Sequence, residues 1–562
     1  MRAPAKTAGL RYWMQRTLEE CDRAAAGFAA GPVHDLRVSL RRCRSMADGM
    51  MAMDPDPAWI AMKKAGKRLF QRLGALRDVQ IMMEWIDRLD LADIKSEQAG
   101  AEQTPQASDA KRTDEIESSA AAVHAAPAPE PDHPAHALLH ILKSREIEQK
   151  REARVALEEF NRKQWKRWAI SLPALASRIH PGSAVFKHLA LERWTAARAL
   201  HTAALRNRSQ ISFHALRIGI KRFRYIVENF LPAEHLAWSN DLKHVQDLLG
   251  EVHDLDVLWA TAVACHIFPD AVSRQTWHER ILKERAKRIE EYREKTVGPD
   301  SWWNVWRAGL PQGKEIQQIA TRRVKLWAKV LDPDFAHAER VAGLSLQLYD
   351  GLVKTGMLRM EPEVQGSDNG ATSDARDCLY VAALLHDVGK SAGAKGHHKK
   401  SQALIKKHGT PLGWKPENMA RAAIVARFHT GALPARRHKA LRDLPPGEQK
   451  IIIRLVAILR LANALDSAHD GRIRSIRIEN TAGTARRPNG FLRKPTLLGK
   501  NEALVVTAEG YSDGTPAAQT IAAERYLLET VLRRPVIVKP ASSSRPPTSS
   551  GHRSNSHRQF PQ

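Results

Sequence analysis

The sequence has little cysteine and no long apolar stretch. Its 562 residues include four cysteines, widely separated and without a Cys-x-x-Cys pair, so neither a disulfide framework nor a thiolate metal site is expected. The N-terminus lacks the apolar core of a secretory signal, and no apolar run is long enough to cross a bilayer. We therefore expect a soluble, cytoplasmic protein without a membrane partner.

Negative charge and aromatic side chains are also in short supply. The chain carries 88 lysines and arginines against 62 aspartates and glutamates, a formal net charge of +26, which attracts polyanions of any kind. Aromatic residues make up 6% of the chain, and no stretch alternates them with cations at a spacing suited to stacking bases. Since zinc-finger, helix-turn-helix and RNA-recognition signatures are lacking too, nucleic-acid binding is the less favoured alternative.

One pattern occurs twice, at residues 33–44 and 213–224. Each copy predicts an amphipathic helix with apolar side chains on one face and a histidine and three cations on the other. A file of closely spaced cations suits a ligand with closely spaced negative charges. The candidate phosphate-binding residues are His34, Arg37, Arg41, Arg44, His214, Arg217, Lys221 and Arg224.

Basic residues on a helix face most often simply meet solvent. Here the histidine and the cations recur in the same phase, which solvation does not require, so we favour ligand binding. The alternative is pairing of these cations with Asp78, Asp254 and Asp256, which would hold the halves together; both uses can coexist. The surrounding cations would repel a divalent ion, so we expect His34 and His214 to contact phosphate or to orient an arginine, and not to bind metal.

A second shared element follows each of these helices. Residues 73–79, Leu-Gly-Ala-Leu-Arg-Asp-Val, are echoed by residues 249–255, Leu-Gly-Glu-Val-His-Asp-Leu, so the chain contains two related helical halves. The ordered set of two His-x-x-Arg helices and two Leu-Gly-x-x-x-Asp elements resembles the CHAD domain, the conserved histidine α-helical domain. The resemblance implies a pseudo-twofold bundle of long helices with a basic central groove that binds inorganic polyphosphate.

The length is too great for one core, and changes in composition suggest the domain boundaries. Residues 1–312 form the expected CHAD-like domain, interrupted at about residues 93–136 by an Ala-, Glu-, Ser- and Pro-rich insertion that we expect to be disordered. Glycine and proline breaks near Gly313 precede a second domain at residues 313–540. Residues 541–562 are predicted to be a disordered basic tail.

The second domain contains an adjacent His386-Asp387 pair at the end of an apolar helix, with Gly389 close behind. His337 lies upstream, and the segment Arg-Leu-Ala-Asn-Ala-Leu-Asp, residues 460–466, lies downstream. This ordered set resembles the HD superfamily of metal-dependent phosphohydrolases. The resemblance implies a divalent cation (Mn, Mg or Fe) that polarises a phosphoryl oxygen and generates hydroxide from water, with His386 and Asp387 as catalytic residues.

From about residue 334 to residue 540, the chain is similar to the C-terminal domain of the exopolyphosphatase and guanosine pentaphosphatase family. Near its end we predict short strands at residues 474–479 and 503–508, a helix at 516–533 and a last strand at 536–539. The N-terminal actin-like phosphatase domain of that family has no counterpart in this chain. The family's usual polyphosphatase chemistry therefore cannot be carried over.

One ligand position departs from the HD pattern. Where HD enzymes have the first Asp of Ala-Asp-x-x-Asp, this chain has Asn463, a neutral amide, so we expect Asp466 to be the more important of the two. His398 and His429 stand where two-metal HD enzymes keep additional ligands. By the resemblance, the candidate metal ligands are His337, His386, Asp387, His398, His429 and Asp466.

The sequence thus predicts a mainly α protein, with a pseudo-twofold CHAD helical bundle followed by an all-helical HD-type domain that has a small terminal β element. The expected function is binding of inorganic polyphosphate, combined with a metal-dependent HD phosphohydrolase acting on polyphosphate or phosphorylated nucleotides. Cytoplasmic polyphosphate granules are the candidate location. The alternatives are a non-enzymatic polyphosphate-binding scaffold with a degenerate HD domain and, less favoured, a nucleic-acid-binding protein.

Overall fold

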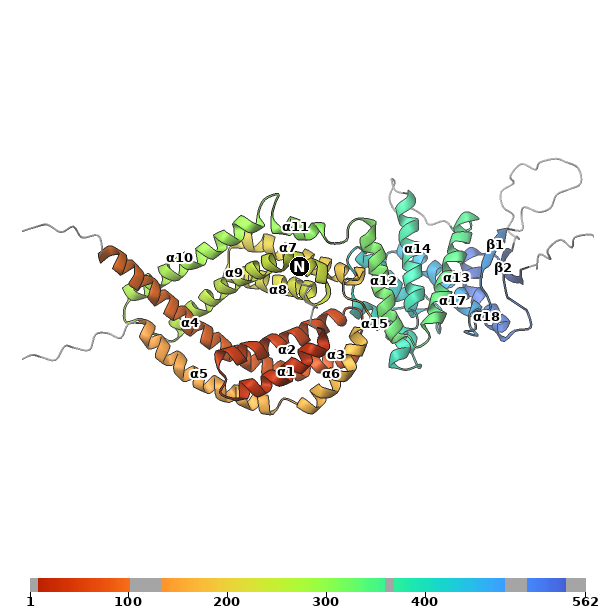
Figure 1. The fold of residues 1–562 in the computed structure, drawn as a ribbon. Helices are drawn as coiled ribbons and strands as arrows, with labels where there is room; N and C mark the ends of the chain where they lie inside the picture. The colour runs from red at the N-terminus through yellow and green to blue at the C-terminus, as the bar shows by residue number, and fades with distance from the viewer. Residues whose placement is uncertain (1–8, 102–133, 359–367, 481–502, 542–562) are drawn as a thin grey trace, which may run out of the picture. The chain divides into compact units, whose positions relative to one another are not determined.

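The computed structural model describes residues 9–101, 134–358, 368–480 and 503–541, and its fold is mainly α, as predicted (Figure 1). The chain divides into two compact units, Met1–Arg323 and Val324–Gln562. The division falls within helix α12 (Lys314–Leu331), beyond Gly313. Most of the insertion expected at residues 93–136, and the tail beyond Ala541, lie outside the described residues.

The first unit is a bundle of helices in two similar halves. The first half contains α1 (Leu10–Ala25), α2 (Ala30–Met50), α3 (Pro57–Ala65), α4 (Lys67–Ala101), α5 (Pro134–Glu158) and α6 (Arg162–Ala176). The second half contains α7 (Ala184–Asn207), α8 (Gln210–Phe230), α9 (Pro232–Ala264), α10 (Ala271–Thr296) and α11 (Trp302–Ala308). The pairings α1 on α2, α2 on α4 and α4 on α5 recur as α7 on α8, α8 on α9 and α9 on α10.

The two copies of the sequence pattern lie in α2 and α8, which pack against each other where the halves meet (Figure 1). Both copies bury the same four positions, as the helical period of about 3.6 residues predicts. These are Val33, Leu36, Leu40 and Cys43 in α2 and Phe213, Leu216, Ile220 and Phe223 in α8. The predicted amphipathic helices are therefore confirmed, and their polar files stay in contact with solvent.

A polar link joins α2 to α8 next to these files. Arg42 forms an ion pair with Glu228 and donates a hydrogen bond to Asn229 Oδ1 at 3.2 Å. The Asn229 amide in turn donates to Ser45 Oγ at 2.9 Å. Because each buried polar group in this link has a partner, the link favours one register between the halves.

An aromatic contact lies at the same interface between α2 and α8. The rings of Phe186 and Phe230 stack with their centroids 4.1 Å apart. A β-carbon at Gly49 of α2 would come within 2.2 Å of the Phe230 ring. Only glycine therefore lets α2 approach the end of α8 this closely.

All four cysteines are free thiols, and burial raises the pKa of Cys21, Cys43 and Cys378 to about 12. These thiols stay protonated at neutral pH and offer no thiolate. Across the described ranges, no helix combines the length and the apolar character needed to cross a membrane.

The second unit places a long apolar helix at its centre. Its helices are α13 (Phe335–Lys354), α14 (Asp368–Leu385), the short 3₁₀ helix η1 (Val388–Ala392), α15 (His397–His408), α16 (Pro416–Arg427), α17 (Pro446–Leu465) and α18 (Pro516–Leu532). α17 is buried on most sides because α13, α14, α16 and α18 all pack on it. A helix that is apolar nearly all round is expected in such a position.

A small sheet lies beside α13. Its strands are β1 (Ile476–Asn480), β2 (Leu504–Ala508) and β3 (Val536–Pro540), in that order across the sheet. β1 and β2 are antiparallel, whereas β2 and β3 are parallel and are connected through α18. The strands and the helix predicted for this region are confirmed to within a few residues.

We expect Gly49→Ala to destabilise the protein by about 1–3 kcal/mol, because the new β-carbon would overlap a ring that stacking holds in place. Gly250→Ala in α9 is the matched control, since no atom lies within 4 Å of its β-carbon. There, the better helix propensity of alanine should raise stability by up to ~1 kcal/mol. Urea unfolding measures both changes. Equal stability of the two variants would contradict the close approach of α2 to Phe230.

Candidate functional site

Four cations from the polar files of α2 and α8 gather between the halves of the first unit. Arg37 and Arg41 come from α2, and Arg217 and Lys221 come from α8; we call them the central cation cluster. All four are half-buried. In the described part of the chain, none has a carboxylate within 4.0 Å, and the Nε atoms of Arg41 and Arg217 are buried without a hydrogen-bond partner.

The members of the cluster act on one another across the seam. Burial, followed by the charges of Arg217, Arg41 and Arg37, lowers the pKa of Lys221 from its usual 10.5 to about 7. Burial also lowers the pKa of Arg37, an effect that Asp78 opposes and that Arg41 and Arg217 increase. Positive charge is therefore concentrated where water is scarce. A polyanion would relieve this repulsion.

The carboxylates considered as alternative partners take two positions. Asp78 of α4 and Asp254 of α9 border the cluster at matching places in the repeat, and burial raises the pKa of Asp254 to about 6. Neither is within 4.0 Å of a cluster cation. Asp256 accepts a hydrogen bond from Arg285 of α10 at 2.9 Å, so it is engaged away from the cluster.

The last arginine of each repeated pattern, Arg44 in α2 and Arg224 in α8, contacts other groups of the protein. Arg44 donates to the Lys63 carbonyl at 2.7 Å, and Arg224 lies 3.7 Å from the Glu228 carboxylate. Both have donors left over, since a guanidinium carries five N–H groups. They border the cluster and contribute less free charge to it.

The histidines of the two repeated helices, His34 and His214, differ in their surroundings. His214 Nδ1 lies 3.2 Å from Nδ1 of His253 on α9, and burial together with Arg217 lowers the pKa of His253 to about 4. In the first half, Arg77 occupies the position of His253 in the repeat. Partial burial and the charge of Arg41 lower the pKa of His34. At neutral pH this position therefore carries a positive charge in the first half, as Arg77, and none in the second, as His253.

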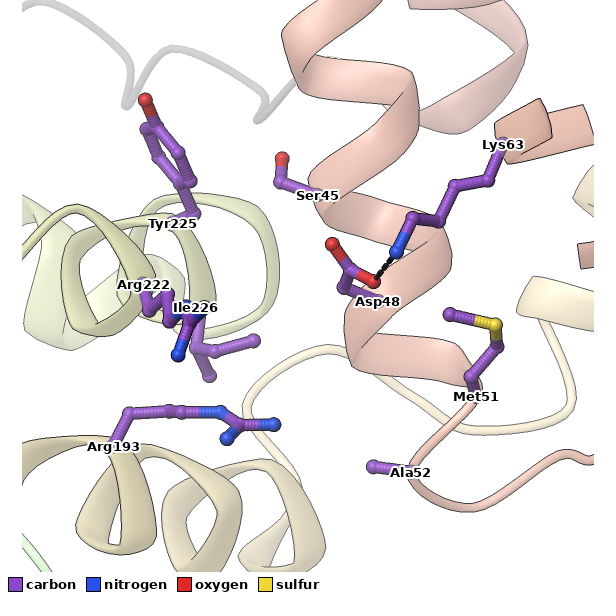
Figure 2. Close-up of a pocket in the computed structure, with 9 residues that line it drawn as sticks. All are labelled: Ser45, Asp48, Met51, Ala52, Lys63, Arg193, Arg222, Tyr225 and Ile226. Carbon is purple, nitrogen blue, oxygen red and sulfur yellow. Dashed lines mark hydrogen bonds and ion pairs between the residues drawn. The ribbon is translucent and has the colours of Figure 1, made fainter. Parts of the chain in front are cut away.

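A cavity of about 430 Å³ lies beside the cluster, between the ends of α2 and α3 and the helices α7 and α8 (Figure 2). Arg193 and Arg222 lie on one side of it, and the ion pair between Lys63 and Asp48 lies on the other. Tyr225 lines the cavity, and the Arg41 guanidinium lies 5.6 Å from its ring centroid. The cavity therefore extends the cationic region on one side of the seam.

A second site is formed by four histidines and one aspartate in the second unit. Two overlapping groups have ligand atoms within 4.8 Å of one another. The groups are His337, His386 and Asp387, and Asp387, His397 and His429. Asp387 belongs to both, so it is the centre of the arrangement, which we call the histidine centre.

Each of these imidazoles uses its Nδ1 to hold the ring in place. The Nδ1 atoms of His386, His397 and His429 lie 2.7, 2.9 and 2.8 Å from the backbone oxygens three residues earlier. A carbonyl only accepts hydrogen bonds, so Nδ1 carries the proton in each ring. The Nε2 atom of each ring therefore carries a lone pair when the ring is neutral, which is the form in which histidine binds metal.

The Nε2 atoms point at the Asp387 carboxylate. His386 Nε2 is 3.3 Å from Oδ2, and the Nε2 atoms of His397 and His429 are 3.2 and 3.5 Å from Oδ1. Burial alone would raise the pKa of Asp387, but His386, His429 and Lys390 hold it well below its usual range. These groups are buried away from water, and a divalent cation between them would interact favourably with the carboxylate and with the Nε2 atoms of neutral rings. These residues fit a divalent metal.

Asp466 and Asn463 take different places around His337. Asp466 accepts from His337 Nδ1 at 2.7 Å and pairs with Arg340 Nε at 2.9 Å. Its carboxylate therefore lies behind the imidazole and orients it. Asn463 Oδ1 lies 3.0 Å from His337 Nε2, on the side that faces the histidine centre. The structure brings the neutral residue, and not Asp466, to the ligand side.

His397, and not the expected His398, joins the histidine centre. A β-carbon at Gly389 would come within 2.1 Å of the His397 carbonyl, so the glycine lets the start of α15 lie directly on the His-Asp loop. Ser401 Oγ stabilises this contact, because it accepts a hydrogen bond from the Gly389 amide and donates one to the His386 carbonyl. The two histidines are adjacent in the sequence, and the loop before α15 decides which one faces Asp387.

The comparisons with known proteins agree with this division. Residues 13–263 match the CHAD domain, and residues 319–505 match domain III of the Ppx/GppA phosphatases. The chain is also similar to the crystal structure of the CHAD domain from the plant Ricinus communis, at 19% identity, over 55% of this chain and 96% of that one, with a TM-score of 0.30. No curated protein gives a significant match. By the two family matches, the chain carries a CHAD domain followed by a Ppx/GppA domain III.

We expect Lys221→Met to stabilise the ligand-free protein most at low pH. The pKa of Lys221 is about 7 in the fold and returns to its ordinary high value on unfolding. Its charge therefore destabilises the fold fully below pH 7, less as pH rises, and not at all above the unfolded pKa. Thermal unfolding at pH 6 and pH 10 tests this, with exposed Lys166→Met as control. An equal shift at both pH values would contradict the crowded cluster.

Proposed function

We propose that the CHAD domain of this chain binds inorganic polyphosphate through the central cation cluster. The observation that carries the proposal is the set of four half-buried cations without a carboxylate within 4.0 Å. Folding normally pairs buried cations, so cations left unpaired on two helices at once favour an anionic ligand. Polyphosphate carries a negative charge on every unit and can contact both files together.

The aromatic rings around the cluster favour polyphosphate over nucleic acid. The guanidinium of Arg41 lies 5.6 Å from the Tyr225 ring centroid, and that of Arg37 lies 5.8 Å from the Phe70 centroid. These rings are thus engaged by arginines. Proteins that hold single-stranded nucleic acid offer open rings on which bases stack. A ligand made only of phosphate needs no such platform.

Replacing Arg37, Arg41, Arg217 and Lys221 with alanine should lower the affinity for polyphosphate at least about a hundredfold, because each contact removed is charge-assisted. It should also lower the slope of log affinity against log salt by roughly one unit per lost contact. Titration calorimetry at several salt concentrations measures both effects.

The matched control replaces four exposed lysines of the same unit, Lys163, Lys166, Lys283 and Lys287, and changes the net charge equally. It should weaken binding little. Equal losses in the two quadruple variants would mean that net charge, and not the cluster, attracts the ligand. Single-stranded DNA that displaces polyphosphate at equal charge concentration would favour the nucleic-acid alternative.

We also propose that the histidine centre is an HD-type metal site that hydrolyses a phosphate ester or anhydride. His337, His386 and Asp387 would hold one divalent cation, with His397 and His429 available for a second. A cation so bound lowers the pKa of water and polarises a phosphoryl oxygen. Lys390, whose Nζ lies 2.5 Å from Asp387 Oδ2, keeps the carboxylate ionised and fixed. Polyphosphate and phosphorylated nucleotides are the candidate substrates.

We expect His397→Ala to lower the amount of Mn²⁺ bound by the full-length protein and His398→Ala to leave it unchanged. The two histidines are neighbours in sequence, but only His397 contacts Asp387. His386→Ala and Asp387→Asn should abolish binding, and Asp466→Asn should weaken it less because Asp466 acts through His337. Metal content after dialysis, and phosphate release from polyphosphate and guanosine pentaphosphate, are the measurements. A full-length protein that binds metal without releasing phosphate would support the scaffold alternative.

A further inference from the structure

The histidine centre is short of negative charge. Imidazoles bind a metal in their neutral form, and Asp387 is the shared carboxylate of the two ligand groups. Lys390 Nζ, 2.5 Å from Asp387 Oδ2, takes up part of that charge. Asn463, on the ligand side of His337, adds none. A divalent cation held here would leave net positive charge in a buried place, which opposes binding.

Asp332 is a buried carboxylate near this centre that the proposed metal site does not use. It lies between α12 and α13 and is 3% exposed. Its Oδ1 accepts from the Asp334 amide at 3.0 Å, but its Oδ2 is buried without a hydrogen-bond partner. Unsatisfied buried carboxylate oxygens are rare in folded proteins because water would solvate them strongly.

Two atoms of the histidine centre, His386 Nε2 and Asp387 Oδ1, are likewise buried without a hydrogen-bond partner. Asp332 lies in the turn that leads to His337, because the Asp334 amide donates to Asp332 Oδ1 and the His337 amide donates to Asp334 Oδ1. Burial raises the pKa of Asp332 and the Asp334 amide lowers it; of the charges nearby, Asp387 raises it, and His386 and Lys390 lower it. The two carboxylate oxygens lack donors in the protein alone, and His386 Nε2 offers a lone pair when its ring is neutral. One cation near them would interact favourably with all three.

We propose that Asp332 supplies the second negative charge of the metal centre and so compensates for the neutral Asn463. Asp332 is in neither group of ligand atoms within 4.8 Å, so it would act on the cation through its charge and not as one of these ligands. Mutation of groups behind the metal ligands commonly lowers metal affinity by about 10- to 100-fold. The inference rests on the proposed metal binding and assigns a residue that the sequence patterns did not single out.

The variant Asp332→Asn removes the charge of residue 332 and can keep its hydrogen bond. An asparagine can keep the Oδ1 bond to the Asp334 amide while it replaces the unpartnered Oδ2 with a neutral group. The metal-free variant should therefore be as stable as the parent, or more stable. Its affinity for Mn²⁺ should fall at least about tenfold, in the range seen when groups behind metal ligands are removed. Asn463→Asp in the same variant should restore affinity, because it returns the missing charge.

The experiment measures Mn²⁺ affinity by equilibrium dialysis and the thermal midpoint without metal, both on the full-length protein. Asp350→Asn is the matched control, since Asp350 is an exposed carboxylate of α13 paired with Arg376. It should leave Mn²⁺ affinity unchanged. The supporting result is weaker binding in Asp332→Asn, an undiminished metal-free midpoint, and recovery with Asn463→Asp.

Three results would overturn the inference, and they are distinct. Parent protein that binds no Mn²⁺ would remove the proposed metal site and this inference together. Parent and Asp332→Asn protein with equal affinity would remove the inference and leave the metal site standing. A lower metal-free midpoint in Asp332→Asn, without recovery of affinity by Asn463→Asp, would make Asp332 a structural residue.

Discussion

Both compact units hold ionisable groups close together and away from water. In the first, the cations of α2 and α8 lower one another's pKa values; in the second, imidazole nitrogens and carboxylate oxygens gather around Asp387. Lost hydration opposes folding at both places, and repulsion between like charges adds to it in the first. The surrounding packing must therefore hold each arrangement, and a ligand of opposite charge would offset what folding loses.

In the first unit, two neighbouring arginines of α2 have different roles: one stabilises the fold, and the other has no carboxylate partner. Arg42 points into the seam and pairs with Glu228, whereas Arg41 belongs to the cluster without a carboxylate partner. Consecutive residues of a helix are about 100° apart, so one side chain fixes the halves while the next stays available. The close approach at Gly49 holds the α2–α8 seam on which this division depends.

In the second unit, ring orientation is decided by the backbone. His386, His397 and His429 each bond Nδ1 to an oxygen three residues earlier, and His337 uses Asp466. Four separate segments therefore present Nε2 toward one region before any ligand arrives. Pre-orientation of this kind reduces the entropy lost on binding. It also explains why Asp466, though acidic and near the centre, acts on the imidazole.

The sequence by itself determined the mainly α fold, the two amphipathic helices and the small terminal sheet, because periodic burial and turn residues are local properties. It also singled out His337, His386, Asp387 and His429. Only the tertiary structure decided between His397 and His398, placed Asp466 behind His337, and left Asp332 buried without a partner for Oδ2. These outcomes depend on how segments that are distant in sequence pack together. A local sequence pattern does not contain that information.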